Sequence, residues 1–363
     1  MAAIDLRSDT VTLPTARMRA RMAEAELGDD SRDGDPTVKA LEALAAARTG
    51  KEAALFLPSG TMANLVALLA HTGRGGEVLL DGECHIARTE MGGIATLAGL
   101  LPRAVPAARG ALDLKALAEA INPTLAPNRL ATALVTMETT HNAAGGAVLP
   151  LDNMAGVAAL AREHGVPVHI DGARLFNAAA ALGVGAKEIA QHGDSVCFCV
   201  SKGLSAPVGS LLCGSGAFVA RARAFRRMAG GNMRQAGVVA AAGIVALEEM
   251  TERLAEDHAR AQRLAQGLHA IAHSLAIPAE VESNIVNVDV GRSRHSAGEW
   301  ATALAAHGVL AGPARRTSLR LVTHRHIGDA EVEAALAAFA AVWHAFHHRA
   351  RAGEGSGRKA AAH

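Results

Sequence analysis

Short apolar runs alternate with longer Ala- and Leu-rich stretches between residues 40 and 245, and this alternation limits the possible folds more than any other feature. An apolar run of about 4–8 residues between turn residues is typical of a buried strand, and the longer stretches have helical spacing. Strands separated by helices predict βαβ units, and therefore an α/β fold around a mostly parallel central sheet.

The segments expected from this pattern extend over most of the chain. The predicted strands are Ala53–Pro58, Glu77–Leu80, Thr132–Met137, Val166–Ile170, Ser195–Val200 and Gly209–Cys213. The predicted helices between them include Asn64–His71, Leu114–Ile121, Met154–His164 and Ala186–Gln191. A long helical segment, Val238–His273, precedes two further strands and a last helix: Asn284–Val290, Ser318–Val322 and Asp329–Arg349. We expect an N-terminal arm (1–20), a large domain (21–245), a smaller C-terminal α+β domain (246–349) and a disordered tail (350–363).

Composition excludes several classes of partner. The chain has 36 Lys and Arg against 35 Asp and Glu, which is too balanced for a surface that binds nucleic acid. It has no Tyr, 7 Phe and 2 Trp, so a base-stacking surface is not expected either. The N-terminus lacks the apolar core of a signal peptide, and we expect no membrane contact and a cytoplasmic location. The four cysteines fit buried free thiols in that reducing compartment, and no metal set is expected.

The first candidate site is the turn Pro58-Ser59-Gly60-Thr61, where a strand ends and a helix begins. Backbone N–H groups, hydroxyls and the helix dipole at such a turn can bind a phosphate. The same residues also fit an ordinary helix cap, and the turn alone does not separate the two interpretations.

Two further strand ends carry charged residues. Asp171 follows the apolar run of Val168-His169-Ile170, where open α/β sheets bind ligands, although it also fits a helix cap paired with Arg174. Lys202 follows the next strand, where burial would free its amine for a Schiff base, although it also fits a surface lysine. A phosphate cradle, a strand-end Asp and a strand-end Lys in this order match the phosphate, ring nitrogen and aldehyde of pyridoxal 5′-phosphate (PLP).

Longer blocks then carry a family resemblance. They are LRSDTVTLP (6–14), GDPTV (34–38), KEAALFLPSGTMANLVALLAH (51–71), METTHN (137–142), HIDGARLFNA (169–178), SKGLSAPVGSLL (201–212) and GGNMRQAG (230–237). With these blocks the chain resembles the low-specificity L-threonine aldolases, fold-type I PLP enzymes related to the β-eliminating lyases.

The resemblance implies roles residue by residue. Lys202 would form the Schiff base with PLP, Asp171 would pair with the pyridinium nitrogen, and His85 would stack on the cofactor ring. The phosphate would be held by Ser59, Gly60, Thr61 and, from a neighbouring subunit, Arg234. Ser8, Arg174 and Arg320 would bind the substrate carboxylate, and His141 would lie near the substrate hydroxyl. Either His85 or His141, directly or through a water, would then be the base.

The implied activity is retro-aldol cleavage of L-threonine, L-allo-threonine and related β-hydroxy amino acids to glycine and an aldehyde. A PLP-dependent β-eliminating lyase, an aldolase for another donor, or a PLP-binding protein without catalysis are the alternatives. The shared phosphate site implies a homodimer or homotetramer.

Two positions depart from the family pattern. Ser31-Arg32 and Ile86-Ala87-Arg88 stand where many relatives have aromatic or polar-aromatic residues. Arg32 or Arg88 would favour a polar or anionic substrate side chain if it faced the site, and would be a solvated surface residue otherwise.

Overall fold

The computed structural model describes residues 3–357, with side chains up to residue 346. Two compact units are present: one consists of residues 12–255, and the other combines residues 3–11 with residues 256–357. The expected divisions at 20/21 and 245/246 differ from these boundaries. Residues 4 and 5 form β1 (Ile4–Asp5), which pairs with β12 (Val309–Leu310) and so places the start of the chain in the smaller unit.

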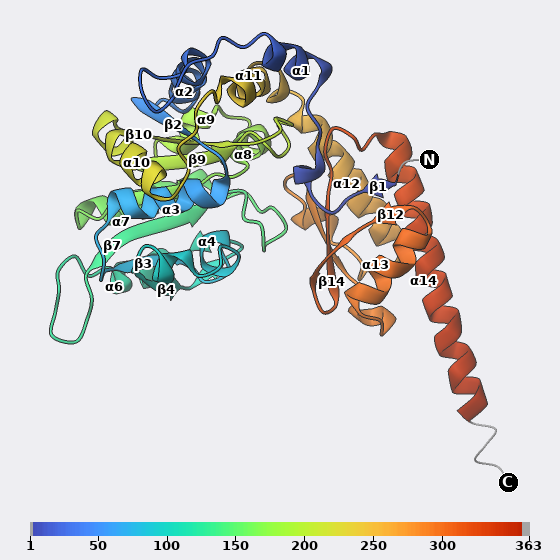
Figure 1. The fold of residues 1–363 in the computed structure, drawn as a ribbon. Helices are drawn as coiled ribbons and strands as arrows, with labels where there is room; N and C mark the ends of the chain where they lie inside the picture. The colour runs from blue at the N-terminus through green and yellow to red at the C-terminus, as the bar shows by residue number, and fades with distance from the viewer. Residues whose placement is uncertain (1–2, 358–363) are drawn as a thin grey trace. The chain divides into compact units, whose positions relative to one another are not determined.

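The larger unit is built around a seven-stranded sheet (Figure 1). Its strands, in spatial order, are β2 (Ala53–Leu57), β10 (Ser210–Gly214), β9 (Ser195–Cys199), β8 (Val168–Asp171), β7 (Thr132–Glu138), β3 (Glu77–Asp81) and β4 (Leu101–Val105). Strand β10 is antiparallel to both of its neighbours, and the strands from β9 to β4 are parallel. The predicted α/β fold with a mostly parallel sheet is therefore confirmed.

Helices and a small hairpin complete this unit. They are α1 (Ala16–Ala23), α2 (Pro36–Thr49), α3 (Gly60–His71), α4 (His85–Arg88), α5 (Gly93–Thr96), the hairpin β5 (Ala107–Ala108) and β6 (Ala111–Leu112), α6 (Leu114–Ala120), α7 (Leu151–Glu163), α8 (Leu175–Leu182), α9 (Ala186–Ala190), α10 (Gly216–Met228) and α11 (Gly237–Val245). Alternation along the strands gives the sheet two buried faces. On β10, for example, Leu211 packs in one apolar cluster and Leu212 in another, with α3 and α10.

The smaller unit has its own apolar core around Trp300 and Phe339. A three-stranded sheet contains β11 (Ile285–Asp289), β14 (Ser318–Val322) and β13 (Gly312–Arg315), and the helices are α12 (Leu254–Ile271), α13 (Ala297–Ala306) and α14 (Asp329–Gly357). The backbone of α14 continues beyond the helix end expected at Arg349, and residues 358–363 of the expected tail lie outside the described residues.

The sequence predicts one continuous helix from Val238 to His273, and this prediction is wrong. In the structure, α11 continues directly into a π-helical turn (Ala246–Met250). A break at residues 251–253 then separates this turn from α12. The break lies close to residue 255, where the larger unit ends.

Two expectations about the whole chain can be compared with the described residues. All four cysteines are buried free thiols, as predicted. Among the described residues, no helix is long and apolar enough to cross a membrane.

Candidate active site

Charged side chains gather at the carboxyl edge of the central sheet. Strand β3 ends at Asp81, β7 at Glu138 and β8 at Asp171, and Lys202 follows shortly after β9. These strands are parallel neighbours, so their carboxyl ends share one edge. Ligands of open α/β sheets bind at this edge, which makes it the candidate active site.

Asp171 is the most deeply buried of these groups, with 1% of its surface exposed. Its Oδ2 accepts a hydrogen bond from Asn64 Nδ2 at 2.9 Å, and its Oδ1 accepts one from the Ala173 N–H at 3.1 Å. A carboxyl group in this position is costly to bury unless donors compensate for the lost water, and both oxygens have such donors. The site therefore presents a fixed carboxyl group that can pair with a cationic ring nitrogen.

His85 and Glu90 lie beside Asp171. His85 Nδ1 is 2.8 Å from Glu90 Oε1, and ligand atoms of His85, Glu90 and Asp171 all lie within 4.8 Å of one another. The hydrogen bond to Glu90 is the main cause that raises the pKa of His85, and burial raises the pKa of Glu90. This spacing would also suit a metal ion, but Glu90 Oε1 already has a second partner in Asn64 Nδ2 at 2.8 Å.

His141 occupies a closed position at the same edge. Its Nε2 lies 2.9 Å from Asp81 Oδ2, and its Nδ1 is 3.3 Å from the Ala144 N–H, which donates to it. Gly110, at φ +91°, packs on the ring so closely that a Cβ there would lie 2.6 Å from His141 Cδ2. Burial disfavours the charged ring, but Asp81 and Glu138 outweigh it and the pKa of His141 is raised.

Glu138 connects the segments that carry the two histidines. Its Oε1 accepts a hydrogen bond from the Asn142 N–H at 2.7 Å, and its Oε2 accepts one from the His85 N–H. Burial raises the pKa of Glu138, and the Asp171 charge raises it further. Its two backbone contacts make Glu138 a positioning group for both segments.

Lys202 is half-buried in the turn after β9. Its carbonyl accepts hydrogen bonds from Thr12 Oγ1 at 2.8 Å and from the Ser205 N–H at 2.8 Å, which fix the turn. A small cavity of about 10 Å³ is lined by both Lys202 and Arg174, and Arg174 is buried at the start of α8. The structure thus brings these two predicted site residues together.

The predicted phosphate cradle forms the start of α3. Ser59 is the N-cap, and its Oγ accepts a hydrogen bond from the Met62 N–H at 3.2 Å, while the first N–H groups of a helix have no acceptor within the helix. A Cβ at Gly60 would lie 2.9 Å from Cys199 Sγ, so only glycine fits without movement. Ser59 and Thr61 are exposed, and the turn has the donors that a phosphate requires.

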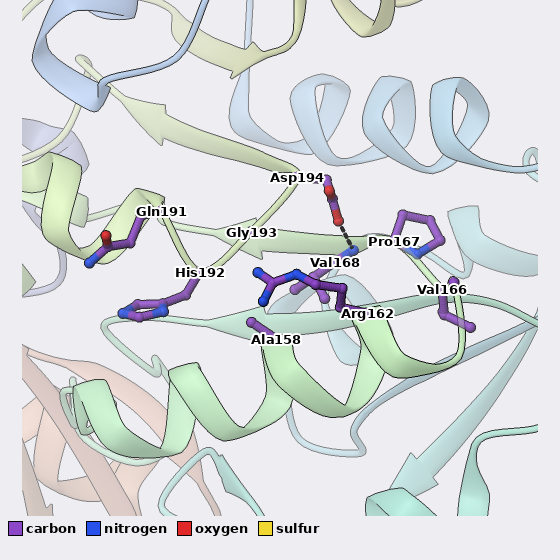
Figure 2. Close-up of a pocket in the computed structure, with 10 residues that line it drawn as sticks. Ala158, Arg162, Val166, Pro167, Val168, Gln191, His192, Gly193 and Asp194 are labelled. Carbon is purple, nitrogen blue, oxygen red and sulfur yellow. Dashed lines mark hydrogen bonds between the residues drawn. The ribbon is translucent and has the colours of Figure 1, made fainter.

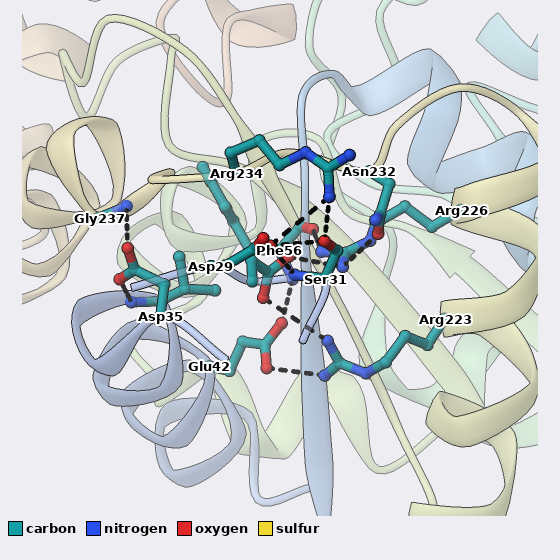
Figure 3. A network of polar contacts seen from close by, with 12 residues as sticks. Asp29, Ser31, Asp35, Glu42, Phe56, Arg223, Arg226, Asn232, Arg234 and Gly237 are labelled. Carbon is teal, nitrogen blue, oxygen red and sulfur yellow. Dashed lines mark hydrogen bonds and ion pairs between the residues drawn. The ribbon is translucent and has the colours of Figure 1, made fainter. Parts of the chain in front are cut away.

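A buried arginine fixes the strand that leads to this cradle (Figure 3). Arg226 has no exposed surface and donates to the Phe56 carbonyl at 2.8 Å and to Asp30 Oδ2 at 2.6 Å. Phe56 lies in β2, three positions before Ser59. The 28–35 loop is therefore attached to the base of the cradle.

Arg234 extends from the same region toward solvent, with 67% of its side chain exposed. Its Nη1 lies 3.7 Å from Asp29 Oδ1 and donates a hydrogen bond to Ser31 Oγ (Figure 3). The contacts of Arg234 described here are therefore with the 28–35 loop.

The two unusual arginines are also exposed. Arg32 has 80% of its side chain exposed and lies 3.8 Å from Asp29. Arg88 has 64% exposed and lies 3.4 Å from Glu83. Within the larger unit, both have the environment of surface residues.

Ser8 and Arg320 belong to the smaller unit. Arg320 lies on β14, and its Nη2 donates to the carbonyl of Arg7 at 3.4 Å, one position before Ser8. The Ser8 Oγ accepts a hydrogen bond from the Thr10 N–H at 3.2 Å. Within the smaller unit, Arg320 therefore lies close to the segment that contains Ser8.

A larger cavity lies at the opposite edge of the sheet (Figure 2). It has a volume of about 300 Å³, and its lining includes Arg162, His192, Asp194 and the start of β8. None of the residues predicted for the active site lines it. The charged groups described above, rather than cavity size, identify the candidate site.

Sequence reasoning missed Asn64, Glu90, Glu138 and Asp81. Asn64 is a polar residue inside the apolar stretch of α3, a signal that was available. Asp81 and Glu138 end strands as Asp171 does, and the same argument would have found them. Glu90 lies in an irregular segment after α4, where no pattern marks it.

Comparison with solved structures identifies the class of fold. The structure matches the threonine aldolase of Leishmania major with a TM-score of 0.79 at 19% identity, covering 94% of this chain and 99% of that chain. It also matches a structure of SPT with PLP, with a TM-score of 0.72 at 21% identity, covering 95% of this chain and 88% of that chain. These likenesses establish the fold shared by those enzymes.

The sequence assigns the family. Residues 5–291 match the model of the beta-eliminating lyases, and the chain belongs to this family. The low specificity L-threonine aldolase of Escherichia coli K12 is 43% identical over 345 residues, which cover 94% of this chain and 99% of the relative. The predicted family resemblance is confirmed.

Proposed function

We propose that this chain is a PLP-dependent aldolase that cleaves L-threonine, L-allo-threonine and related β-hydroxy-α-amino acids to glycine and an aldehyde. One observation carries the proposal: a buried Asp171, held by donors on both oxygens, lies beside His85 at the sheet edge where Lys202 follows the neighbouring strand. The 43% identity to an L-threonine aldolase over nearly the whole chain supports the same substrate.

The residues at this edge fit PLP. The start of α3 offers N–H groups and hydroxyls to the phosphate, and the Asp171 carboxyl group offers an acceptor to the protonated ring nitrogen. Lys202 supplies the amine that binds the cofactor, and His85 supplies a ring of suitable shape for stacking. When bound, PLP provides an electron sink for the pair of electrons released as the Cα–Cβ bond breaks.

Cationic groups orient the substrate. We assign the substrate carboxylate to Arg174, Arg320 and Ser8, because guanidinium groups bind carboxylates through paired hydrogen bonds. A fixed carboxylate limits rotation about Cα, so that the bond to be broken keeps the orientation that the reaction needs.

The two histidines differ in what they offer as a base. Both nitrogens of His141 have contacts within the chain, to Asp81 and to the Ala144 N–H. His85 uses Nδ1 for Glu90 and has 31% of its side chain exposed. We therefore assign removal of the β-hydroxyl proton to His85 Nε2, directly or through a water, and a structural role to His141.

We assign Arg32 and Arg88 to the protein surface, because 80% and 64% of their side chains are exposed and each lies near an acidic neighbour. The Arg88→Ala variant should keep the wild-type ratio of rates on threonine, phenylserine and β-hydroxyaspartate. A selective loss on β-hydroxyaspartate would assign Arg88 to the substrate pocket.

We further propose a cytoplasmic homodimer or homotetramer with shared active sites. The exposure of Arg234 supports this assembly, because a neighbouring subunit could reach its side chain from the solvent side. Sedimentation of the active enzyme would test it, and an active monomer would contradict it.

The alternative is a β-elimination reaction catalysed by the same residues, because the family includes β-eliminating lyases. Elimination of water from threonine would give 2-oxobutanoate and ammonia, whereas retro-aldol cleavage gives acetaldehyde and glycine.

The experiment incubates the PLP-loaded enzyme with each of the four threonine stereoisomers and measures all four products. We expect equal amounts of acetaldehyde and glycine from the L-isomers and none in Lys202→Ala. Formation of 2-oxobutanoate would support the lyase, and cofactor binding without any product would support a PLP-binding protein without catalysis.

A further inference from the structure

A chain of polar side chains runs through an otherwise apolar layer behind Asp171. It consists of Asn64 and His71 from α3, His169 from β8 and Ser195 from β9, and it is called the polar chain below. Ser195 and His169 have no exposed surface, and Asn64 has 2%. Polar groups in such a layer are costly unless each finds a partner, and here each does.

The sequence places the polar chain through two simple periodicities. His169 and Asp171 are two positions apart on β8 and so face the same side of the sheet, and Ser195 is the register partner of His169 on β9. Asn64 and His71 are seven positions apart on α3, which puts them on one face of that helix. Helix α3 packs against β9, so the two sets meet.

The hydrogen bonds follow one another without a gap. His71 Nε2 lies 2.7 Å from Ser195 Oγ, and Ser195 Oγ lies 2.8 Å from His169 Nδ1. His169 Nε2 lies 3.1 Å from Asn64 Oδ1. Asn64 Nδ2 then donates to Asp171 Oδ2 at 2.9 Å.

Chemistry sets the direction of every hydrogen bond. Asn64 must turn its NH₂ group toward Asp171 and Glu90, because a carboxylate accepts and does not donate. Its Oδ1 therefore accepts, and His169 must carry its proton on Nε2. With Nδ1 of a neutral ring left as an acceptor, the Ser195 hydroxyl donates to His169 and accepts from His71 Nε2–H.

Burial favours the neutral form of both imidazoles, which is the form that this pattern requires. Burial lowers the pKa of His169 to about 3, and the titratable groups that face it are His71 and Asp171. Burial also lowers the pKa of His71 to about 4, where Asp194 and Arg221 face it. A further donor, the Cys197 thiol, lies 3.1 Å from Asn64 Oδ1 and fixes the same amide orientation.

We propose that the polar chain is a positioning device that holds the Asp171 carboxyl group in the orientation that the cofactor ring nitrogen requires. All its donors point toward Asp171, and hydrogen bonds aligned in this way polarise and strengthen one another in a low-dielectric interior. His169, Ser195 and His71 act through Asn64 and touch neither cofactor nor substrate. The inference rests on the proposed function only in requiring that PLP binds.

The first test is nuclear magnetic resonance of ¹⁵N-histidine-labelled protein without cofactor. We expect His169 and His71 to be neutral with the proton on Nε2 at pH 7. A proton on Nδ1 of His169, or a charged ring, would overturn the proposal whatever the enzyme's activity.

The second test compares PLP binding among variants. His169→Leu removes the donor to Asn64, and we expect at least about a tenfold rise in the dissociation constant of PLP together with a shift in the pH at which the visible absorption band titrates. Ser195→Ala should show a smaller change in the same direction. His169→Gln should recover part of the binding, because its amide N–H can reach the position of the lost Nε2–H.

Val66→Ala is the matched control, because Val66 is fully buried on α3 in the same apolar layer. It should lower the melting temperature without moving PLP affinity or the titration of the band. If Ser195→Ala and His169→Leu behave as Val66→Ala does, the polar chain is only structural and the proposal fails. A wild-type enzyme that binds PLP normally but shows no aldolase activity would instead contradict the proposed function.

Discussion

His85 and His141 stand at the same edge of the sheet, and each is paired with a carboxyl group, yet their surroundings differ. His85 contacts Glu90 through Nδ1 and has 31% of its side chain exposed. His141 has 2% exposed, lies against Asp81 and is covered by Gly110. A nearby carboxyl group raises the pKa of both rings, so charge alone does not distinguish their roles. Access does, because a general base must reach the proton that it removes.

The comparison separates a chemical from a structural use of the same side chain. A ring with one nitrogen fixed and the other available can transfer a proton. A ring with both nitrogens in contact can hold two segments in place, as His141 holds the end of β3 and the loop after β7.

Among the variants that test this comparison, the largest effect is expected from His85→Asn. Removing the base should lower kcat on L-threonine by about 10²-fold or more, the usual contribution of general acid–base catalysis. Steady-state kinetics at saturating PLP would measure this loss. His141→Asn is the companion variant, and it should mainly reduce stability, by about 2–4 kcal/mol, because it removes the buried ring that lies 2.9 Å from Asp81 Oδ2. A larger kcat loss in His141→Asn than in His85→Asn would reverse the comparison.

Gly110→Ala tests the cover over His141. A Cβ there would lie 2.6 Å from the ring at φ +91°, so we expect the free energy of unfolding to fall by about 1–3 kcal/mol. Gly75→Ala is the control, because Gly75 has the same φ of +91° with no atom within 4 Å of the added Cβ. Chemical denaturation would measure both, and equal losses would show that the His141 ring is not held as described.

Glu90→Gln should have the smallest effect on the maximal rate and a clear effect on its pH dependence. The hydrogen bond to Glu90 raises the pKa of His85, so its loss should lower that pKa. A base with a lower pKa stays unprotonated to lower pH, and the acid limb of the kcat/KM profile should move to lower pH. An unmoved acid limb would show that another group limits the rate there.

The fold could be predicted from local pattern, and so could the positions of Asp171 and Lys202 at one edge of the sheet. Asp171 and Lys202 each follow an apolar strand, and the parallel sheet places such positions at one edge. The start of α3 was visible as a strand–turn–helix junction around Ser59 and Gly60.

The supporting groups depend on which distant elements meet. The contact of Asn64 with Asp171 requires α3 to cover β8 and β9. The lengths of the connections between strands do not predict the strand order that allows this. The burial of His141 depends on the β5–β6 hairpin, through Gly110. Local periodicity contains no information on either contact.

The account assigns a chemical role to His85 and a structural role to His141. The most direct test is to follow the ¹⁵N resonances of both rings in the PLP-loaded enzyme as glycine is added. The account predicts that His85 Nε2 shifts as the amino acid binds, while both nitrogens of His141 keep their positions. A shift of His141 with an unchanged His85 would contradict it.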